Sequence, residues 1–166
     1  MITQDLLHDI WDQFQINWYG IHGISHWSRV HDIGMRLTQA TGANIKVVQL
    51  FSVFHDAGRY NEGRDPQHGP RGADLVALFR YRHLHDLTDE EYKLLRIACR
   101  LHTHAATHED ITVQTCFDSD RLDLGRVGTI PDPKYLCTEA AKSPEMISWA
   151  LERSERGVVP DIFIRN

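Results

Sequence analysis

The sequence predicts an all-α protein, a single domain built as a bundle of at least six helices. Apolar residues recur at intervals of three and four along most of the chain, which is the period of an α-helix. Polar loops that contain glycine or proline separate these segments, and alternating strand patterns are sparse. A chain of 166 residues suits one domain with its own core, so we expect residues 1–166 to form one unit.

Helical spacing in the first half of the chain predicts four helices, over residues 2–18, 25–41, 45–57 and 70–82. Ser25 is a suitable N-cap for the second, because its hydroxyl can accept a hydrogen bond from a backbone N–H of the first turn. The third segment is apolar on nearly every side, which indicates a buried central helix. Pro70 fits the first turn of the fourth, where its missing N–H costs nothing.

The second half of the chain predicts three more helices, over residues 89–102, 113–124 and 137–155. Thr88 and Glu91 have the spacing of a capping box, so the first of these helices should begin directly after Thr88. The tail over residues 157–166 has no helical pattern. We expect it to be extended, with a short strand as one option.

Composition and charge exclude several classes of protein. The net charge is −5 with histidine neutral, so a broad surface that follows nucleic-acid phosphates is not expected. The 3 cysteines lie far apart without a CxxC pair, which argues against a disulfide framework and makes a reducing cytoplasm the natural compartment. No apolar stretch reaches the length of a membrane span, and the first residues lack the basic region of a signal peptide.

Four predicted helices each place a histidine or an aspartate on an apolar face. These residues are His26, His55, His102 and Asp120. Burying such groups is costly unless they are paired or bind a metal, and metal sites in bundles use side chains from facing helices. Each residue alone has a simpler explanation, a core histidine bonded to a carbonyl or an aspartate paired with an arginine. The four together make a metal site an equal alternative, and its nitrogen and oxygen ligands would suit Mn, Fe, Ni, Zn or Mg.

Four short segments add a more specific pattern. They are residues 23–30 (GISHWSRV), 54–59 (FHDAGR), 68–73 (HGPRGA) and 118–123 (DSDRLD). In this order they resemble the HD superfamily of metal-dependent phosphohydrolases, and the resemblance covers about residues 20–125. It implies an HD-domain-like helical bundle. It also implies one divalent metal ion, held by His26, His55, Asp56 and Asp120.

The resemblance assigns further roles near this site. Asp56 would bind the metal and also orient or deprotonate the attacking water. His68 would be either a catalytic or phosphate-binding group that faces the metal, or, with His102, a ligand of a second metal bridged by Asp56. Arg59 and Arg71 lie where each could contact a substrate phosphate, and surface salt bridges are the equally acceptable alternative.

Other polar and aromatic residues are expected to have structural roles. Asp123 is expected to be a structural partner, and Asp118 a surface acid or a helix cap. The remaining histidines are expected at the surface or in local hydrogen bonds: His8, His22, His31, His83, His85, His104 and His108. The tryptophans are expected in the core rather than in a base-stacking platform: Trp11, Trp18, Trp27 and Trp149.

The function implied by the resemblance is hydrolysis of a phosphomonoester or phosphodiester of a small, nucleotide-like metabolite. The partner is then a small phosphorylated substrate, with no membrane, and the sequence leaves an oligomer open. Residues 59–69 are the expected lid or specificity loop. A di-iron HD-type oxygenase is one alternative, because it would use the same ligands with a fuller set around two irons. A non-catalytic ligand-sensing HD domain is another, which the intact set of ligands disfavours.

Overall fold

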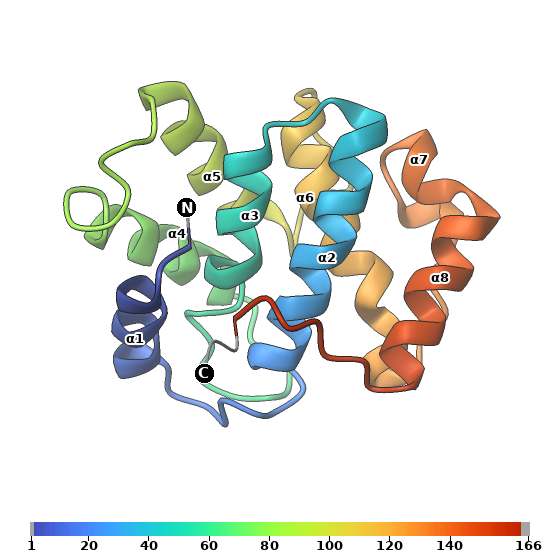
Figure 1. Cartoon of the computed structure of the whole chain (residues 1–166), viewed down its shortest axis with the longest axis horizontal. Coiled ribbons are helices and arrows are strands. Elements are labelled where there is room, and N and C mark those ends of the chain that lie inside the picture. Colours follow the sequence, from blue (N-terminus) through green and yellow to red (C-terminus); the bar gives the residue numbers. More distant parts are fainter. Residues whose placement is uncertain (1, 164–166) are drawn as a thin grey trace.

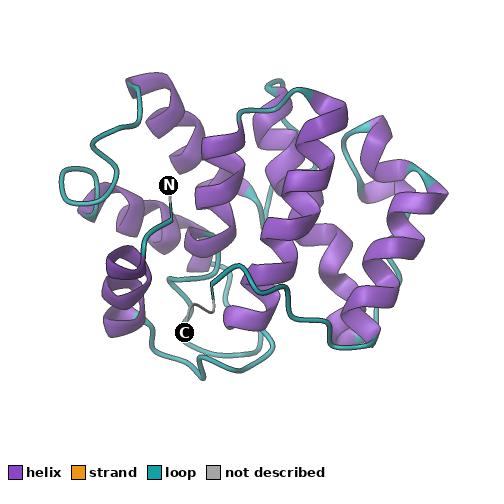
Figure 2. Ribbon diagram, viewed as in Figure 1, coloured by secondary structure: helices purple, strands orange, loops and turns teal. Residues whose placement is uncertain are grey.

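The computed structural model describes residues 2–163, and over this range the chain forms eight α-helices and two short 3-10 helices. The α-helices are α1 (Gln4–Gln13), α2 (Ile24–Thr41), α3 (Ile45–Phe54), α4 (His68–Leu78), α5 (Asp89–Leu101), α6 (Ile111–Arg121), α7 (Glu139–Lys142) and α8 (Pro144–Glu155). The 3-10 helices are η1 (Leu122–Val127) and η2 (Pro133–Tyr135). Figure 2 shows helices joined by loops, without a strand in the described part. The prediction of an all-α bundle with at least six helices is confirmed.

Helix α3 lies at the centre of the bundle (Figure 1), where it packs against α2, α5 and α6. Its apolar side chains from Val47 to Phe54 are buried, as the apolar pattern predicts. Phe51 and Phe54 are fully buried, and burial of each ring stabilises the fold by about 1.5–3 kcal/mol. This rigid centre carries His55 and Asp56 directly after its last turn.

A second, smaller core lies on the other side of α2. Ile33 and Leu37 of α2 meet Leu122 of η1 together with apolar residues of α7 and α8, such as Met146 and Ala150. Figure 1 shows α7 and α8 beside α2, away from α1 and α4. The packing fixes the end of α6 and the start of η1 against α2, which matters because both segments carry polar residues of the site described below.

The first predicted helix is too long at its C-terminal end. Helix α1 ends at Gln13, because Phe14 has an extended backbone with φ −76° and ψ 126°. Turns follow, and the N–H of Ile24 donates to the carbonyl of Trp18 at 2.8 Å. The apolar spacing continues past Gln13 because Phe14 and Trp18 still pack against the main core.

The start of α2 also differs from the prediction. The N-cap is Gly23, and Ser25 lies inside the first turn. A side chain at Gly23 would place its Cβ 1.9 Å from the carbonyl oxygen of Trp18, so the close turn before α2 requires glycine. Ser25 was therefore the wrong cap, because the chain already turns into the helix two residues earlier.

Three other boundaries have local causes. Helix α4 begins at His68, so Pro70 lies in its first turn. Residues 122–127 tighten into η1 and do not continue α6. The single helix predicted over 137–155 is two helices: Ser143 ends α7 and caps α8, and Pro144 has no N–H with which to continue α7. The capping box of Thr88 at the start of α5 is confirmed.

The tail and one tryptophan also differ from the prediction. Residues 157–163 contain no strand, and residues 164–166 of the predicted extended tail lie outside the described range. Trp27 is fully buried, as expected, whereas Trp11 is 51% exposed and stacks on Trp18 with ring centroids 5.0 Å apart. The prediction of a core position was wrong for Trp11. None of the described helices has the length and apolarity needed to cross a membrane.

Candidate metal centre

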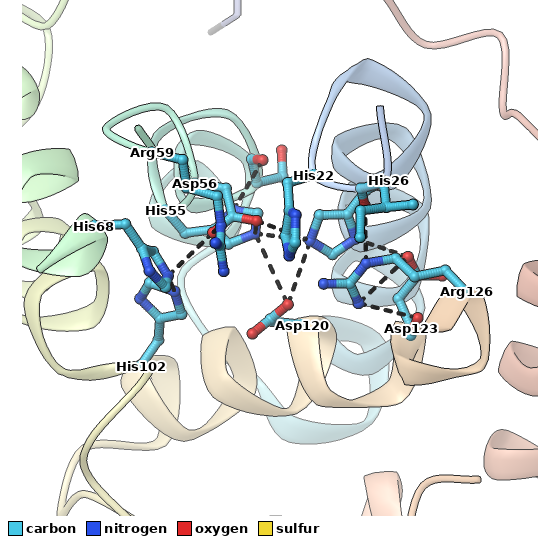
Figure 3. A network of polar contacts seen from close by, with 12 residues as sticks. His22, His26, His55, Asp56, Arg59, His68, His102, Asp120, Asp123 and Arg126 are labelled. Carbon is cyan, nitrogen blue, oxygen red and sulfur yellow. Dashed lines mark hydrogen bonds and ion pairs between the residues drawn. The ribbon is translucent and has the colours of Figure 1, made fainter. Parts of the chain in front are cut away.

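Five helices bring imidazoles and carboxylates to one interior point (Figure 3). Most of these side chains lie at a helix end: near the start of α2, just after α3, at the first residue of α4, just after α5, and within the last turn of α6. They are His26, His55, Asp56, His68, His102 and Asp120. The four imidazoles and Asp56 are buried, with at most 5% of each residue exposed.

The four residues predicted as ligands of one metal lie together. Nε2 of His26 is 3.0 Å from Nε2 of His55, 3.6 Å from Oδ2 of Asp56 and 3.4 Å from Oδ1 of Asp120. Nε2 of His55 is 3.8 Å from each of the same two carboxylate oxygens. Two ligands that each lie about 2.1 Å from an ion stand about 3.0–3.4 Å apart at tetrahedral or octahedral angles. The observed separations are close to these values.

A second group shares Asp56 with the first. Nε2 of His68 lies 3.1 Å from Oδ1 of Asp56 and 2.9 Å from Nε2 of His102. Asp56 thus turns one carboxylate oxygen toward His26 and His55 and the other toward His68. The ligand atoms of Asp56, His68 and His102 lie within 4.8 Å of one another. The arrangement suits two adjacent ions with Asp56 between them.

Hydrogen bonds fix the tautomer of all four imidazoles. Nδ1 of His55 donates to the carbonyls of Phe51 and Ser52 at 3.1 Å, and Nδ1 of His102 donates to the carbonyl of Cys99 at 2.8 Å. Nδ1 of His68 donates to the carbonyl of Asp65, and Nδ1 of His26 donates to Oδ2 of Asp123. Carbonyl and carboxylate oxygens only accept, so each Nδ1 carries the proton and each neutral ring keeps a lone pair on Nε2.

These lone pairs face one another within each group. Two acceptors 2.9–3.0 Å apart repel unless a cation or a proton lies between them. Burial lowers the pKa of His55 to about 3 and that of His68 to about 4, so one ring of each pair stays neutral near pH 7. Neutral imidazoles with fixed Nδ1–H groups are the form that binds metal ions. The donor set therefore fits divalent metal ions.

Comparisons of the chain with known proteins found no relative. No protein-family model, no curated protein and no solved structure matches the chain. The resemblance to the HD superfamily rests on the four sequence segments, and membership of that family stays a prediction.

Two aspartates close to Asp120 have separate roles. Asp123 is fully buried and accepts hydrogen bonds from His26 and from Arg29, as expected of a structural partner. Burial alone would raise the pKa of Asp123, but these two partners hold it below its usual value. Asp118 is also buried and accepts from the backbone N–H groups of Cys137 and Thr138, just before α7. Both expected roles were wrong: Asp118 is buried within α6, and the cap of α7 is Thr138, which Asp118 holds in place.

The two predicted phosphate-binding arginines lie in different places. Arg59 is at the centre, because its Nε donates to Oδ1 of Asp56 at 3.0 Å. Arg71 instead donates to the carbonyl of Gly58 and to Asp65, and its guanidinium lies 3.9 Å from the ring centroid of Tyr60. The structure gives Arg71 the role of holding the 59–69 loop, and it does not bring its guanidinium to the metal ligands.

His22 and Arg126 lie at the centre although the sequence analysis did not place them there (Figure 3). His22 is 7% exposed, its Nδ1 donates to Glu62 at 2.7 Å, and its ring centroid is 6.3 Å from that of His26. Burial lowers its pKa. Nη1 of Arg126 donates to the carbonyl of Asp123 at 3.1 Å. The one sequence signal for His22 was its position four residues before His26. This signal is weak because His22 precedes α2, which begins at Ile24.

Proposed function

We propose that the chain is a metal-dependent phosphohydrolase that acts on a small, nucleotide-like phosphate ester. One observation carries the proposal: two pairs of Nε2 lone pairs face each other and share one carboxylate, Asp56. Such a donor set could hold metal ions, and its nitrogen and oxygen ligands suit Mn, Fe, Ni, Zn or Mg. The four sequence segments that resemble the HD superfamily support hydrolysis as the reaction.

Each residue of the centre would have a specific role in hydrolysis. A bound divalent ion would lower the pKa of a water molecule and polarise the phosphoryl oxygen. His26, His55, Asp56 and Asp120 hold it, and the carbonyls and Asp123 that accept from the Nδ1 atoms keep the rings in the binding orientation. Asp56 also orients the attacking water, because its two oxygens face both groups of ligands.

His68 has two predicted roles, and its contacts favour one of them. Its Nδ1–H is bonded to the carbonyl of Asp65, so its neutral Nε2 accepts and does not donate. A ligand or a proton acceptor needs that lone pair, whereas a proton donor needs a second proton on the ring. We therefore assign His68 with His102 to a second metal; the catalytic role of His68, acceptance of a proton from water, would use the same lone pair and is the alternative to that metal.

A cavity beside the centre would receive the organic part of the substrate. It has a volume of about 550 Å³, and its walls include His102, Leu124, Ile130 and Tyr135. Pockets of this size and apolar character commonly bind small metabolites. His102 belongs both to this cavity and to the second group of ligands, which links the cavity to the proposed chemistry. A nucleoside-sized group fits this description.

A di-iron oxygenase is the second candidate, and the second group of ligands favours it. Asp56, His68 and His102 give the fuller set that a two-iron centre needs. Metal identity separates the two candidates, because two irons per chain with oxygen consumption would favour the oxygenase. A non-catalytic sensing domain would bind metal and ligand without turnover.

The test combines metal analysis with a panel of phosphate esters. The wild-type protein should contain a divalent metal and release phosphate from at least one nucleotide-like ester. Asp56→Ala should abolish turnover, because it removes the carboxylate shared by both groups of ligands. Asp74→Ala, at a side chain that is 68% exposed, is the matched control and should retain activity. A wild-type protein that neither contains nor is activated by a metal would contradict the proposal.

A further inference from the structure

Two arginines reach the candidate metal centre from different sides. Figure 3 shows Arg59 beside Asp56 and His55, and Arg126 beside Asp123, with both guanidinium groups directed toward the middle of the cluster. The two side chains are only 10% and 9% exposed. Arginines buried to this extent require partners, so the contacts of each guanidinium group are informative.

Each guanidinium group is fixed on two nitrogens and free on the third. Arg59 donates from Nε to Asp56 and from Nη1 to the carbonyls of Asn61 and Gly63. Arg126 donates from Nε to the carbonyl of Ile21 at 3.0 Å and from Nη1 to the carbonyl of Asp123. Among the described residues, nothing accepts a hydrogen bond from Nη2 of either arginine. Each guanidinium group is therefore held in place and keeps one NH₂ group unused by the described residues.

His22 lies between the two arginines. Figure 3 shows its ring in the space between their guanidinium groups. Burial is the main cause of its lowered pKa, and the charges of Arg59 and Arg126 lower it further. Both guanidinium groups are thus close enough to act on one ring. The two guanidinium groups therefore lie on either side of His22, at the edge of the metal ligands (Figure 3).

The number of donors matches one class of phosphate. A phosphomonoester has three non-bridging oxygens and carries up to two negative charges. A metal ion and the Nη2 groups of Arg59 and Arg126 would offer one partner for each of these oxygens. A phosphodiester has only two such oxygens. Its second esterified oxygen, which carries no charge, would then lie beside one of the two guanidinium groups.

We propose that Arg59 and Arg126 bind the non-bridging oxygens of a terminal phosphate, so that the centre takes phosphomonoesters in preference to phosphodiesters. Arg126 is the specificity-determining residue, because Arg59 is also paired with the metal ligand Asp56. This inference rests on the proposed metal centre and names the substrate class for it.

The test compares two esters with the same leaving group, p-nitrophenyl phosphate and bis(p-nitrophenyl) phosphate, on Mn²⁺-loaded protein. Arg126→Gln should lower kcat/KM for the monoester by about 100-fold, the usual effect of removing one donor to a developing phosphoryl charge. The value for the diester should change far less. Affinity for inorganic phosphate, measured by calorimetry, should fall by about 10- to 100-fold. Arg156→Gln, at a side chain that is 73% exposed and pairs with Glu152, is the matched control and should change neither quantity.

Metal content separates failure of this inference from failure of the proposed function. If Arg126→Gln keeps its metal and binds phosphate as the wild type does, or loses monoester and diester activity equally, the inference is overturned and the metal centre stands. If the wild type binds no metal, both fail. Should circular dichroism show that Arg126→Gln does not fold, Arg126→Lys provides the same comparison, because lysine keeps the charge without the planar pair of NH₂ groups.

Discussion

His26 and Asp123 are joined by a hydrogen bond of 2.7 Å between Nδ1 and Oδ2, across 97 positions of the sequence. The bond connects α2 to η1 and directs Nε2 of His26 toward His55. Asp123 also accepts from Nε of Arg29 at 2.6 Å, so α2 holds this carboxylate by two side chains from successive turns. The orientation of one proposed ligand thus depends on a residue that does not touch the metal position.

Asp123→Asn should weaken metal binding without removing a ligand. The amide keeps the shape of the side chain but loses the charge that fixes the His26 tautomer, and changes of this kind lower metal affinity by about 10- to 100-fold. Titration with Mn²⁺ or Zn²⁺ measures the effect. Asp132→Asn, at a residue that pairs with the nearby Lys134 at the surface, is the matched control. Equal metal affinity in Asp123→Asn and wild type would contradict the role given to Asp123.

Removal of the metal should destabilise the protein. A ligand that binds only the folded state at 100 times its Kd adds about 2.7 kcal/mol to the free energy of unfolding. Treatment with a chelator should therefore lower Tm, and readdition of the metal should restore it. Asp120→Asn should reduce this metal-dependent shift, because the amide loses the charge that Asp120 turns toward Nε2 of both His26 and His55. A Tm that is the same with and without chelator would argue against a structural metal centre.

Helical periodicity located the residues of the centre that lie on apolar helix faces. His26, His102 and Asp120 follow this rule, since each is spaced by four or seven from buried apolar neighbours. His68 is the first residue of α4 and follows a polar loop, so no apolar neighbours one turn earlier could select it, and it entered only through the resemblance. Arg126 comes from a 3-10 helix, where the helical period fails, and no pattern could have placed it.

Two helix boundaries were misplaced because apolar spacing continues across the end of a helix. The apolar spacing of the first helix continues past Gln13 because Phe14 and Trp18 pack on the core from a loop. Loop residues that pack in this way continue the apolar spacing of a helix although the backbone is not helical. The break before Pro144 was readable in principle, because Ser143 followed by proline is a typical helix start. Apolar spacing on both sides of it favoured one long helix.

His31 should make stability depend on pH. Burial lowers its pKa, with Asp32 opposing the shift, and its Nδ1 is buried without a hydrogen-bond partner among residues 2–163. Above pH 6.5 the ring is neutral in both the folded and the unfolded state. Below that value the unfolded state takes up the proton more readily, so the free energy of unfolding falls as the pH falls.

His31→Gln should remove this part of the pH dependence. Urea unfolding of metal-free protein between pH 7.5 and pH 5 measures it, as the difference between variant and wild type. His85→Gln, at an exposed position, is the matched control. A variant whose stability falls with pH as steeply as that of the wild type would show that His31 is not the source.

Gly72 should be essential to the spacing between the two groups of ligands. It lies on α4, one turn after His68, and a Cβ at this position would approach the carbonyl oxygen of Phe54 to 2.5 Å and that of His55 to 3.1 Å. Gly72→Ala must therefore push α4 away from the end of α3. Overpacking of this kind costs about 1–3 kcal/mol, and the shift should separate His68 from Asp56.

The expected result for Gly72→Ala is a lower Tm together with loss of the second metal. Metal counting should then give a lower stoichiometry, while the ligands around His26 keep the first ion. Gly63→Ala is the matched control, because Gly63 is exposed on the 59–69 loop and a Cβ there meets only the Asn61 side chain, at 3.4 Å. If Gly72→Ala lowers Tm but leaves the metal stoichiometry unchanged, the contact supports the fold and does not set the distance between His68 and Asp56.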